Sequence, residues 1–412
     1  MALPEPPCAL RAVELASGAT AAVHEWGSGV ALGASSTVVF LHATGFHARC
    51  WGQVVAHLHG GGGASPPRCI GIDLRGHGRS SKPWPPAALT DPWGDASADV
   101  AEALDALGIR QAVLVGHSAG GWVAADVAAS EAIARATADG DSGSVPKAVH
   151  PVVGGLVLLD PVIVAEEQCP SPPPARPATL LLRICRSCTP GRFPLTRGRV
   201  RADDEYTALD AEERAAWKQL RYAGIERRYN AFTSPAAMRE RFSGRPPYTD
   251  WRPQCLEDYC AHGLLTVEEL RELAHRVDGD DGSPEEAEEA LVGDRGEAAG
   301  AMVLACLPRF ERAWYEGSRA AGRGAGLLHD LHRVTVPVDI VRSSLDGTNP
   351  DGSVNFAGSP TEPDLWKRFA NATDEIAPDL SHFIPMEDPL YAATRVRKML
   401  AGVGSGGEPA RL

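Results

Sequence analysis

The stretch AVLVGHSAGGWVAADVAAS, residues 112–130, joins two kinds of secondary structure with no linker between them. Residues 112–115 form a short apolar run that is typical of a buried strand, whereas residues 121–129 are rich in alanine and apolar at helical spacing. The turn between them is GHSAG, with Ser118 at its centre. We therefore predict that the chain passes from strand to helix on a single serine.

The turn fits the pattern G-x-S-x-G, which presents a serine hydroxyl above a sheet in a strained backbone conformation. Gly116 and Gly120 fit this pattern, because in such a turn the strand and the helix pass too close to each other to leave room for side chains. The helix that follows directs its free N–H groups at the reaction site. The alternative is an ordinary tight turn, which requires neither the strand nor the helix. We predict that Ser118 is a nucleophile and that His117 and the two glycines support its turn.

A serine nucleophile needs a base, and the base needs an orienting acid. After a turn of this type the acid precedes the histidine in the chain. His382, in DLSHFIPMEDP, is the predicted base, and its alternative is a surface-loop histidine. Asp346, in SLDGT, is the predicted acid because of its order and loop position, although aspartate before glycine is also common in turns. Asp160, at the end of GLVLLD, is the rival acid.

Acyl transfer also requires hydrogen-bond donors for the developing oxyanion. One donor is predicted to be the backbone N–H of Ala119. The second is expected in HATGF, residues 42–46, where Thr44 occupies the appropriate position. His42 and Gly45 are expected to shape this loop. His42 is alternatively a base, but a histidine that stabilises the turn is favoured.

Strands and helices alternate in the first part of the chain, and this order returns near the end. The pattern predicts an α/β protein with a mostly parallel central sheet flanked by helices. The core is predicted over residues 1–165 and 331–400. Residues 166–330 are predicted to be a mainly helical insertion, here called the cap, with a disordered acidic loop at about 277–299. A disordered tail is expected at 401–412.

The composition of the chain argues against some classes of binding partner and some cellular locations. The formal net charge of −13 argues against a surface for nucleic acid or anionic membrane. Nine irregularly spaced cysteines suggest reduced thiols. The start of the chain does not resemble a secretory signal, and no apolar run is long enough to span a membrane. We expect a cytoplasmic protein without a membrane span, and the sequence does not indicate an oligomeric state.

The segments FLHATGF, DLRGHGRSSKP, GHSAGGW, VPVDIVRSSLDGT and SHFIPMEDP together resemble the α/β-hydrolase superfamily. The resemblance implies an α/β-hydrolase fold. Ala43, Ser381 and the pair Ser343-Ser344 stand where glycine is frequent in the family. Members that open epoxides or displace halide carry aspartate at the nucleophile position, so Ser118 makes that chemistry unexpected.

The leading hypothesis is an enzyme that hydrolyses a carboxylic ester through an acyl-serine, with a small apolar acyl molecule as substrate and no cofactor or metal. One alternative is hydrolysis of a thioester or carbon–carbon bond with the same three residues. The other is a non-catalytic ligand receptor on the same fold. The cap is expected to roof the substrate pocket with Trp251, Tyr248 and Phe232, although such aromatic residues more often form core.

Overall fold

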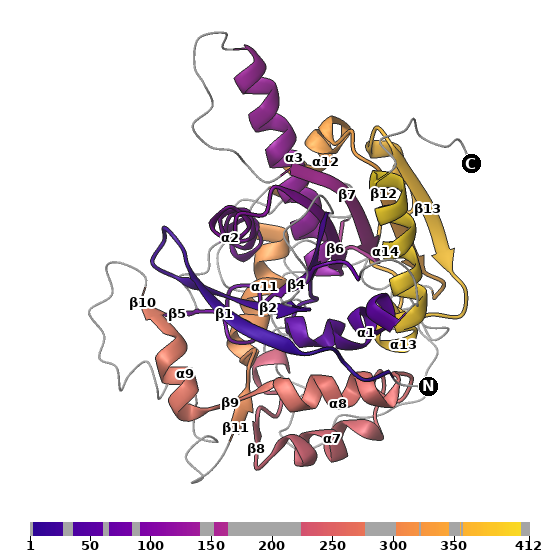
Figure 1. Ribbon diagram of the computed structural model, residues 1–412. Coiled ribbons are helices and arrows are strands. Elements are labelled where there is room, and N and C mark those ends of the chain that lie inside the picture. The colour runs from indigo at the N-terminus through magenta and orange to yellow at the C-terminus, as the bar shows by residue number, and fades with distance from the viewer. Residues whose placement is uncertain are drawn as a thin grey trace, which may run out of the picture.

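The computed structural model describes ten stretches of the chain (Figure 1). These stretches are residues 3–27, 36–60, 66–84, 91–140, 152–163, 224–276, 302–320, 323–345, 355 and 357–404.

An eight-stranded sheet forms the centre of the described structure. Its strands, in spatial order, are β1 (Cys8–Glu14), β2 (Thr20–Trp26), β4 (Cys69–Ile72), β3 (Thr37–Leu41), β6 (Gln111–His117), β7 (Val152–Leu159), β12 (Val338–Ser343) and β13 (Ala372–Ala377). β1 pairs antiparallel with β2, and β2 pairs antiparallel with β4. All remaining neighbours in this sheet are parallel. The carboxyl ends of β6, β7 and β12 therefore lie along one edge of the sheet.

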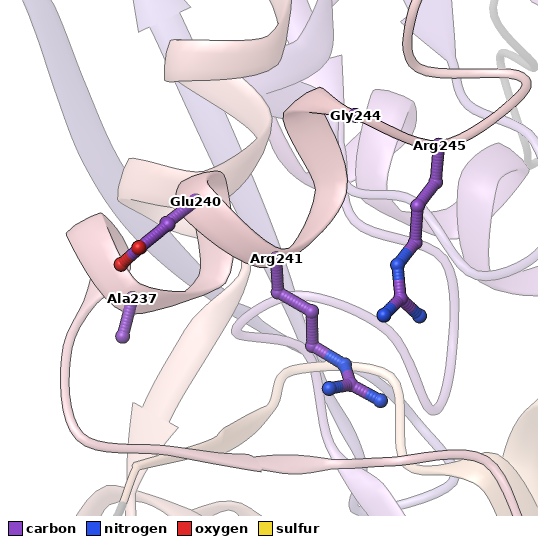
Figure 2. A pocket seen from close by; sticks show the side chains of 5 residues that line it. All are labelled: Ala237, Glu240, Arg241, Gly244 and Arg245. Atoms are coloured by element: carbon purple, nitrogen blue, oxygen red, sulfur yellow. The ribbon is translucent and has the colours of Figure 1, made fainter.

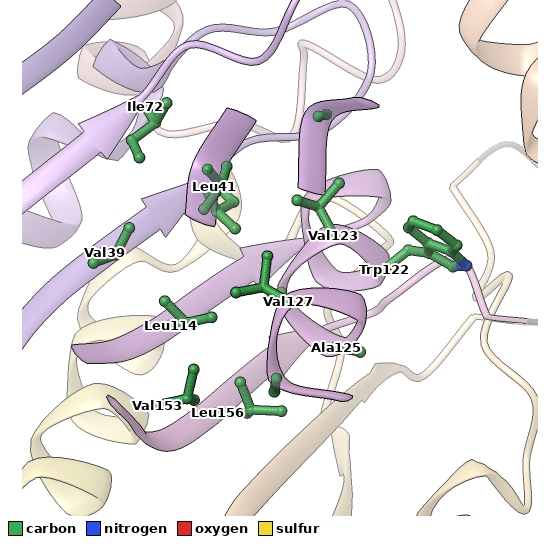
Figure 3. Packing of buried hydrophobic residues seen from close by; sticks show 14 of the residues in the cluster. Val39, Leu41, Ile72, Leu114, Trp122, Val123, Ala125, Val127, Val153 and Leu156 are labelled. Carbon is green, nitrogen blue, oxygen red and sulfur yellow. The ribbon is translucent and has the colours of Figure 1, made fainter. Parts of the chain in front are cut away.

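Both faces of the sheet are apolar, as expected for parallel strands covered by helices. Successive side chains of a strand point to opposite faces, so Val39 and Leu41 pack on one side while Val38 and Phe40 pack on the other. Figure 3 shows the first side, where strand residues such as Leu114 meet the helix that follows the serine. Full burial of such a side chain contributes about 1.5–3 kcal/mol relative to exposure.

Helices cover both faces of the sheet (Figure 1). On the side of Val39 and Leu41 lie α2 (Pro92–Ala106) and α3 (Ala119–Gly140). On the opposite side α1 (Gly52–Gly60) packs beside α14 (Pro389–Gly404).

Two further helices, α11 (Pro308–Ala320) and α12 (Arg323–Asp330), fall inside the range predicted for the cap. They contribute Trp314, Leu327 and Leu328 to the same hydrophobic cluster as α2 and α3. This part of the predicted insertion thus packs directly on the helices of the core.

The other cap elements form a small layer at one end of the molecule (Figure 1). Its helices are α7 (Pro235–Ser243), α8 (Pro253–His262) and α9 (Val267–Leu273). Its strands β8 (Ala231–Phe232), β11 (Met302–Leu304) and β9 (Leu264–Thr266) form a three-stranded sheet, while β10 (Ala274–Arg276) pairs with β5 (Lys82–Trp84) of the core. Ser234 and Thr266 cap α7 and α9 by accepting hydrogen bonds from the first-turn N–H groups.

The expected α/β architecture, with a mostly parallel sheet between helices, is confirmed. One boundary differs from the prediction. Helix α14 continues to Gly404, so residues 401–404 are helical although the sequence suggested a tail without structure from 401 onward. The acidic loop predicted at 277–299 and the rest of that tail lie outside the described residues.

Candidate active site

Ser118 occupies the turn between β6 and α3, and its φ of +55° lies in the left-handed region that non-glycine residues rarely adopt. The two flanking glycines are required by close packing. A Cβ on Gly116 would lie 2.3 Å from the carbonyl oxygen of Gly120, and a Cβ on Gly120 would lie 2.3 Å from that of Leu41. The turn is therefore pressed against its own helix and against the end of the neighbouring strand β3, which leaves the serine in one backbone conformation.

The side chain of His382 joins Ser118 to an aspartate. Nε2 of His382 lies 3.0 Å from Oγ of Ser118, and Nδ1 lies 2.7 Å from Oδ2 of Asp160. In the tautomer that fits both contacts, the serine hydroxyl donates to Nε2 and the Nδ1–H donates to the carboxylate. Asp160 is completely buried and Ser118 is 7% exposed, so the chain of contacts runs from the interior outward.

Asp160, the rival acid in the sequence, is the carboxylate that contacts His382. Both ring nitrogens of His382 are occupied, by Ser118 and Asp160, so Asp160 takes the position that the sequence argument assigned to Asp346. Asp346 itself lies outside the described residues. In the sheet, β7, which ends just before Asp160, lies between β6 and β12.

Ser343 and Ser359, near the end of β12 and beyond, donate hydrogen bonds to Asp160, and Thr361, whose hydroxyl donates to the carbonyl of Pro161 at 2.7 Å, lies beside them. The backbone N–H of Ser343 and the hydroxyl of Thr361 lie 3.1 and 3.2 Å from Oδ1, and the hydroxyl of Ser359 contacts the same oxygen. Burial raises the pKa of Asp160, but hydrogen bonds from His382, Ser359 and Ser343 outweigh burial and hold the pKa below its usual value. Ser359 and Thr361 carry no sequence motif, so the sequence alone does not predict their place at this site.

The segment that carries His382 is held from two sides. Its backbone N–H donates to the carbonyl of Ala357 at 2.6 Å, and its carbonyl accepts from Nε2 of His117 at 2.7 Å. Burial lowers the pKa of His117 to about 3, so this imidazole is neutral. His117, predicted only as support for the serine turn, thus also contacts the backbone of the histidine.

Residues 42–46 form a tight turn next to the serine, closed by the N–H of Phe46 donating to the carbonyl of Ala43 at 3.1 Å. His42 donates from Nδ1 to the carbonyl of Ala43 at 2.8 Å and accepts the N–H of Leu74 on Nε2 at 3.0 Å. Burial lowers the pKa of His42 to about 4. With both nitrogens engaged by the backbone, His42 fits the expected loop-stabilising role, and neither nitrogen is left to serve as a base.

Thr44 lies within this turn, and Ala119 is the first residue of α3, immediately after the serine. Gly45 has φ +81° and donates its N–H to Nε2 of His77 at 3.0 Å. His77 was not identified from the sequence. It lies in DLRGHGRSSKP, a segment that resembles the α/β-hydrolase superfamily, and this segment contacts the turn that holds Thr44.

The three aromatic residues predicted for the substrate pocket belong to one hydrophobic cluster. Trp251 and Phe232 are buried, and Tyr248 is half-buried. The ring of Trp251 lies 5.5 Å from Phe46 and 5.6 Å from Phe383, between centroids, so the cluster joins the cap to the two loops beside the serine.

A recess of about 410 Å³ lies on the outer face of α7. Figure 2 shows the side chains of Arg241 and Arg245 extending to the same side of the helix, with Glu240 pointing away from them. Both arginines are exposed, and the guanidinium of Arg241 lies 4.3 Å from the ring centre of Tyr229. The recess shares no residue with the turn of Ser118.

Among the described residues, no three or more His, Cys, Asp or Glu side chains are grouped as metal ligands would be. Within the same part of the chain, no helix has the length and apolar character needed to cross a membrane.

The sheet order, the serine turn and the histidine contact together define the α/β-hydrolase fold. The alpha/beta hydrolase family matches residues 38–395, and this chain belongs to that family. No curated protein matches the sequence.

Solved structures agree on the fold. The peroxisomal alpha-beta-hydrolase Lpx1 from Saccharomyces cerevisiae is 14% identical with a TM-score of 0.56, over 99% of this chain and 88% of its own. A probable hydrolytic enzyme from Pseudomonas aeruginosa is 16% identical with a TM-score of 0.52, over 96% and 94%. The thioesterase domain from the curacin biosynthetic pathway is 14% identical with a TM-score of 0.56, over 95% and 99%.

Proposed function

We propose that this protein is a serine hydrolase that cleaves a carboxylic ester, with Ser118 as nucleophile, His382 as general base and Asp160 as orienting acid. The observation that carries the proposal is the unbroken chain of contacts from Oγ of Ser118 through His382 to the buried Asp160. A nucleophile within hydrogen-bond reach of a base that is itself oriented by a third group is the arrangement required for covalent acyl transfer.

In the proposed reaction, Oγ of Ser118 forms a bond to the ester carbonyl carbon while Nε2 of His382 takes the hydroxyl proton. The carbon–oxygen double bond becomes an oxyanion, which the N–H groups of Thr44 and Ala119 stabilise. When the bond to the alcohol breaks, His382 returns the proton to the leaving oxygen. Water, deprotonated by His382, then attacks the acyl-serine, and Ser118 recovers its proton as the carboxylic acid leaves.

Asp160 supports each of these proton transfers. Its contact with Nδ1 keeps Nε2 free to accept from Ser118, and its negative charge stabilises the imidazolium that forms. A low pKa matches this role because the carboxylate must stay ionised while His382 carries the positive charge.

We propose a small apolar acyl molecule as substrate because aromatic side chains border the reacting residues. Phe383 directly follows the base, with a ring-to-ring distance of 5.5 Å, and Phe46 belongs to the turn that carries Thr44. These rings disfavour a strongly hydrated acyl group. The same three reacting residues also suit a thioester, which makes bond type the first question for experiment.

The test is covalent labelling of Ser118 with a fluorophosphonate, followed by a substrate panel. Wild type is expected to be labelled, Ser118→Ala to lose all labelling, and Ser130→Ala, which changes an exposed serine on α3, to label normally. The panel comprises p-nitrophenyl esters of graded chain length, the matching thioesters and a diketone.

Ester turnover that exceeds thioester and diketone turnover supports the proposal. Labelling that persists in Ser118→Ala refutes the nucleophile. Labelling without turnover of any panel member supports the receptor alternative instead.

A further inference from the structure

Gly45, next to the proposed oxyanion donor Thr44, is contacted by several side chains from outside its own turn, three of which lie against its N–H, its carbonyl and its Cα. Nε2 of His77 accepts its N–H at 3.0 Å, and the hydroxyl of Tyr259 lies 3.5 Å from its carbonyl oxygen. On the open side of its Cα lies Glu311, whose Oε1 would be 3.2 Å from a Cβ at this position. Two of these three groups, Tyr259 and Glu311, belong to the segment predicted as the cap.

Glu311 is held in place by Arg228. The Arg228 guanidinium donates to Oε2 of Glu311, and the Glu311 residue is only 7% exposed. Burial opposes the positive charge of Arg228, but Glu311 more than compensates and the pKa of Arg228 lies above its usual value. The Glu311 side chain is 9% exposed and that of Arg228 is 28% exposed, so removing Arg228 would leave a largely buried carboxylate without its partner. The pair therefore fixes the position of the carboxylate beside Gly45.

The same helix also supports the other side of the turn. Glu311 and Trp314 both lie on α11, and Nε1 of Trp314 donates to the carbonyl of Arg75 at 3.2 Å. The ring of Trp314 lies 5.0 Å from His77, which accepts the N–H of Gly45. Two side chains of α11 therefore support Gly45. Glu311 contacts it directly, and Trp314 packs on His77, which accepts its N–H.

We propose that Glu311, held by Arg228, is a positioning residue that sets the turn of Thr44 and Gly45 for oxyanion binding. The inference rests on the proposed function and extends it, because it gives cap residues an effect on the chemical step as well as on substrate binding. A donor contributes fully only when it points at the developing charge, so loosening this turn is expected to lower kcat more than it changes KM.

Three variants separate position from charge. Glu311→Ala removes the group that packs on Gly45, Glu311→Gln keeps its shape and its contact with Arg228, and Arg228→Met removes the partner. The matched control is Glu316→Ala, which removes another α11 carboxylate whose ion pair, with Arg312 at 2.9 Å, involves no residue of the turn.

The kinetic readout is hydrolysis of a short p-nitrophenyl ester together with the rate of labelling by a fluorophosphonate, on full-length protein. Glu311→Ala and Arg228→Met are expected to lower kcat and labelling by about 10- to 100-fold with KM changed little. Glu311→Gln retains most of the rate, and Glu316→Ala matches wild type. Equal kcat and labelling in wild type and in a folded Glu311→Ala protein would overturn the proposal.

The structural readout does not depend on activity. Hydrogen–deuterium exchange of the peptide spanning residues 42–47 is expected to speed up in Glu311→Ala and to stay unchanged in Glu316→Ala. If exchange in this peptide is the same in all variants, Glu311 does not position the turn. If wild type neither labels nor hydrolyses any ester, the proposed function fails, and the exchange measurement still decides whether Glu311 holds the turn.

Discussion

Asp160 and His382 lie 222 positions apart in the chain, yet Oδ2 of the aspartate is 2.7 Å from Nδ1 of the histidine. Asp160 has φ +48° at the end of β7, so two of the three residues in this chain of contacts, Ser118 and Asp160, have left-handed backbones. Such conformations persist only where the surrounding structure enforces them, and they gather at functional sites. Here the enforcement comes from the packed glycines around Ser118 and from the hydrogen bonds that Asp160 accepts.

The first prediction concerns the acid. Asp160→Asn is expected to keep the fold, because an amide oxygen still accepts from Ser343 and Ser359. The amide cannot, however, stabilise an imidazolium on His382, and kcat/KM should fall by about 10⁴-fold. Steady-state hydrolysis of a p-nitrophenyl ester measures the effect. Asp346→Asn serves as the comparison and should retain most activity. The opposite ranking of the two variants would restore Asp346 as the acid.

The second prediction concerns strain at the nucleophile. Ser118→Gly and Ser118→Ala both remove the hydroxyl, so their difference in stability reports the left-handed backbone alone. Relief of strain by glycine outweighs its entropy cost, and Ser118→Gly should be more stable by about 0.5–1 kcal/mol in urea unfolding.

Ser130 provides the matched control for this comparison because it is exposed and helical on α3. At that site the order should reverse, with glycine less stable than alanine by about 1 kcal/mol. The same order at both sites would mean that the strain at Ser118 is not energetically significant.

Much of this site could be predicted from sequence because its signals are local. The turn of Ser118 requires only a strand, two glycines and a helix in succession. His382 lies in a short segment between a strand-like run and a helix. Asp160 and Asp346 both follow apolar runs, and local sequence does not tell which run lies beside β6. The choice of acid depends on which carboxylate meets His382 in the folded chain, which is a non-local property. The contact of Glu311 with Gly45 is equally non-local, since no spacing rule links two residues from separate layers.

The third prediction is a loss of stability in mild acid. Burial lowers the pKa of His42 to about 4 and that of His117 to about 3, from a usual value of 6.5. At these two sites the unfolded chain binds protons more readily than the native protein, so their contribution to stability is fully present above pH 6.5 and is lost as the pH drops toward the lower values. Urea unfolding at several pH values between about 7 and 5 measures the slope.

A pair of histidine variants checks the cause of that slope. His117→Gln should make the slope less steep because one buried imidazole is removed, and His329→Gln, which changes a side chain that is 77% exposed, is the control. The pKa of Asp160 is lowered from 3.8, so its contribution is present above that value and is lost only at lower pH. A pH-independent unfolding free energy down to about pH 5 would contradict the burial of neutral histidines.

The last prediction separates core from pocket among the cap aromatics. Trp251 is 5% exposed and touches Phe46, Phe383 and Tyr248, so Trp251→Ala should destabilise the protein by about 3–5 kcal/mol. Tyr248 is half-buried and stacks on Phe242 with 4.6 Å between ring centres. Tyr248→Ala is expected to shift the preferred acyl length, with a smaller loss of stability because less surface is buried.

Tyr229→Ala is the control for both variants, because Tyr229 also packs on a cap aromatic, Phe232, but is 42% exposed. It should change neither the unfolding free energy by more than about 1 kcal/mol nor the acyl preference. The measurements are urea unfolding and kcat/KM across the graded p-nitrophenyl esters. Because Phe46 is part of the turn that carries Thr44, Trp251→Ala should lower kcat for every ester by a similar factor. A selective loss for long esters in Trp251→Ala, with stability unchanged, would instead place its ring in the substrate pocket.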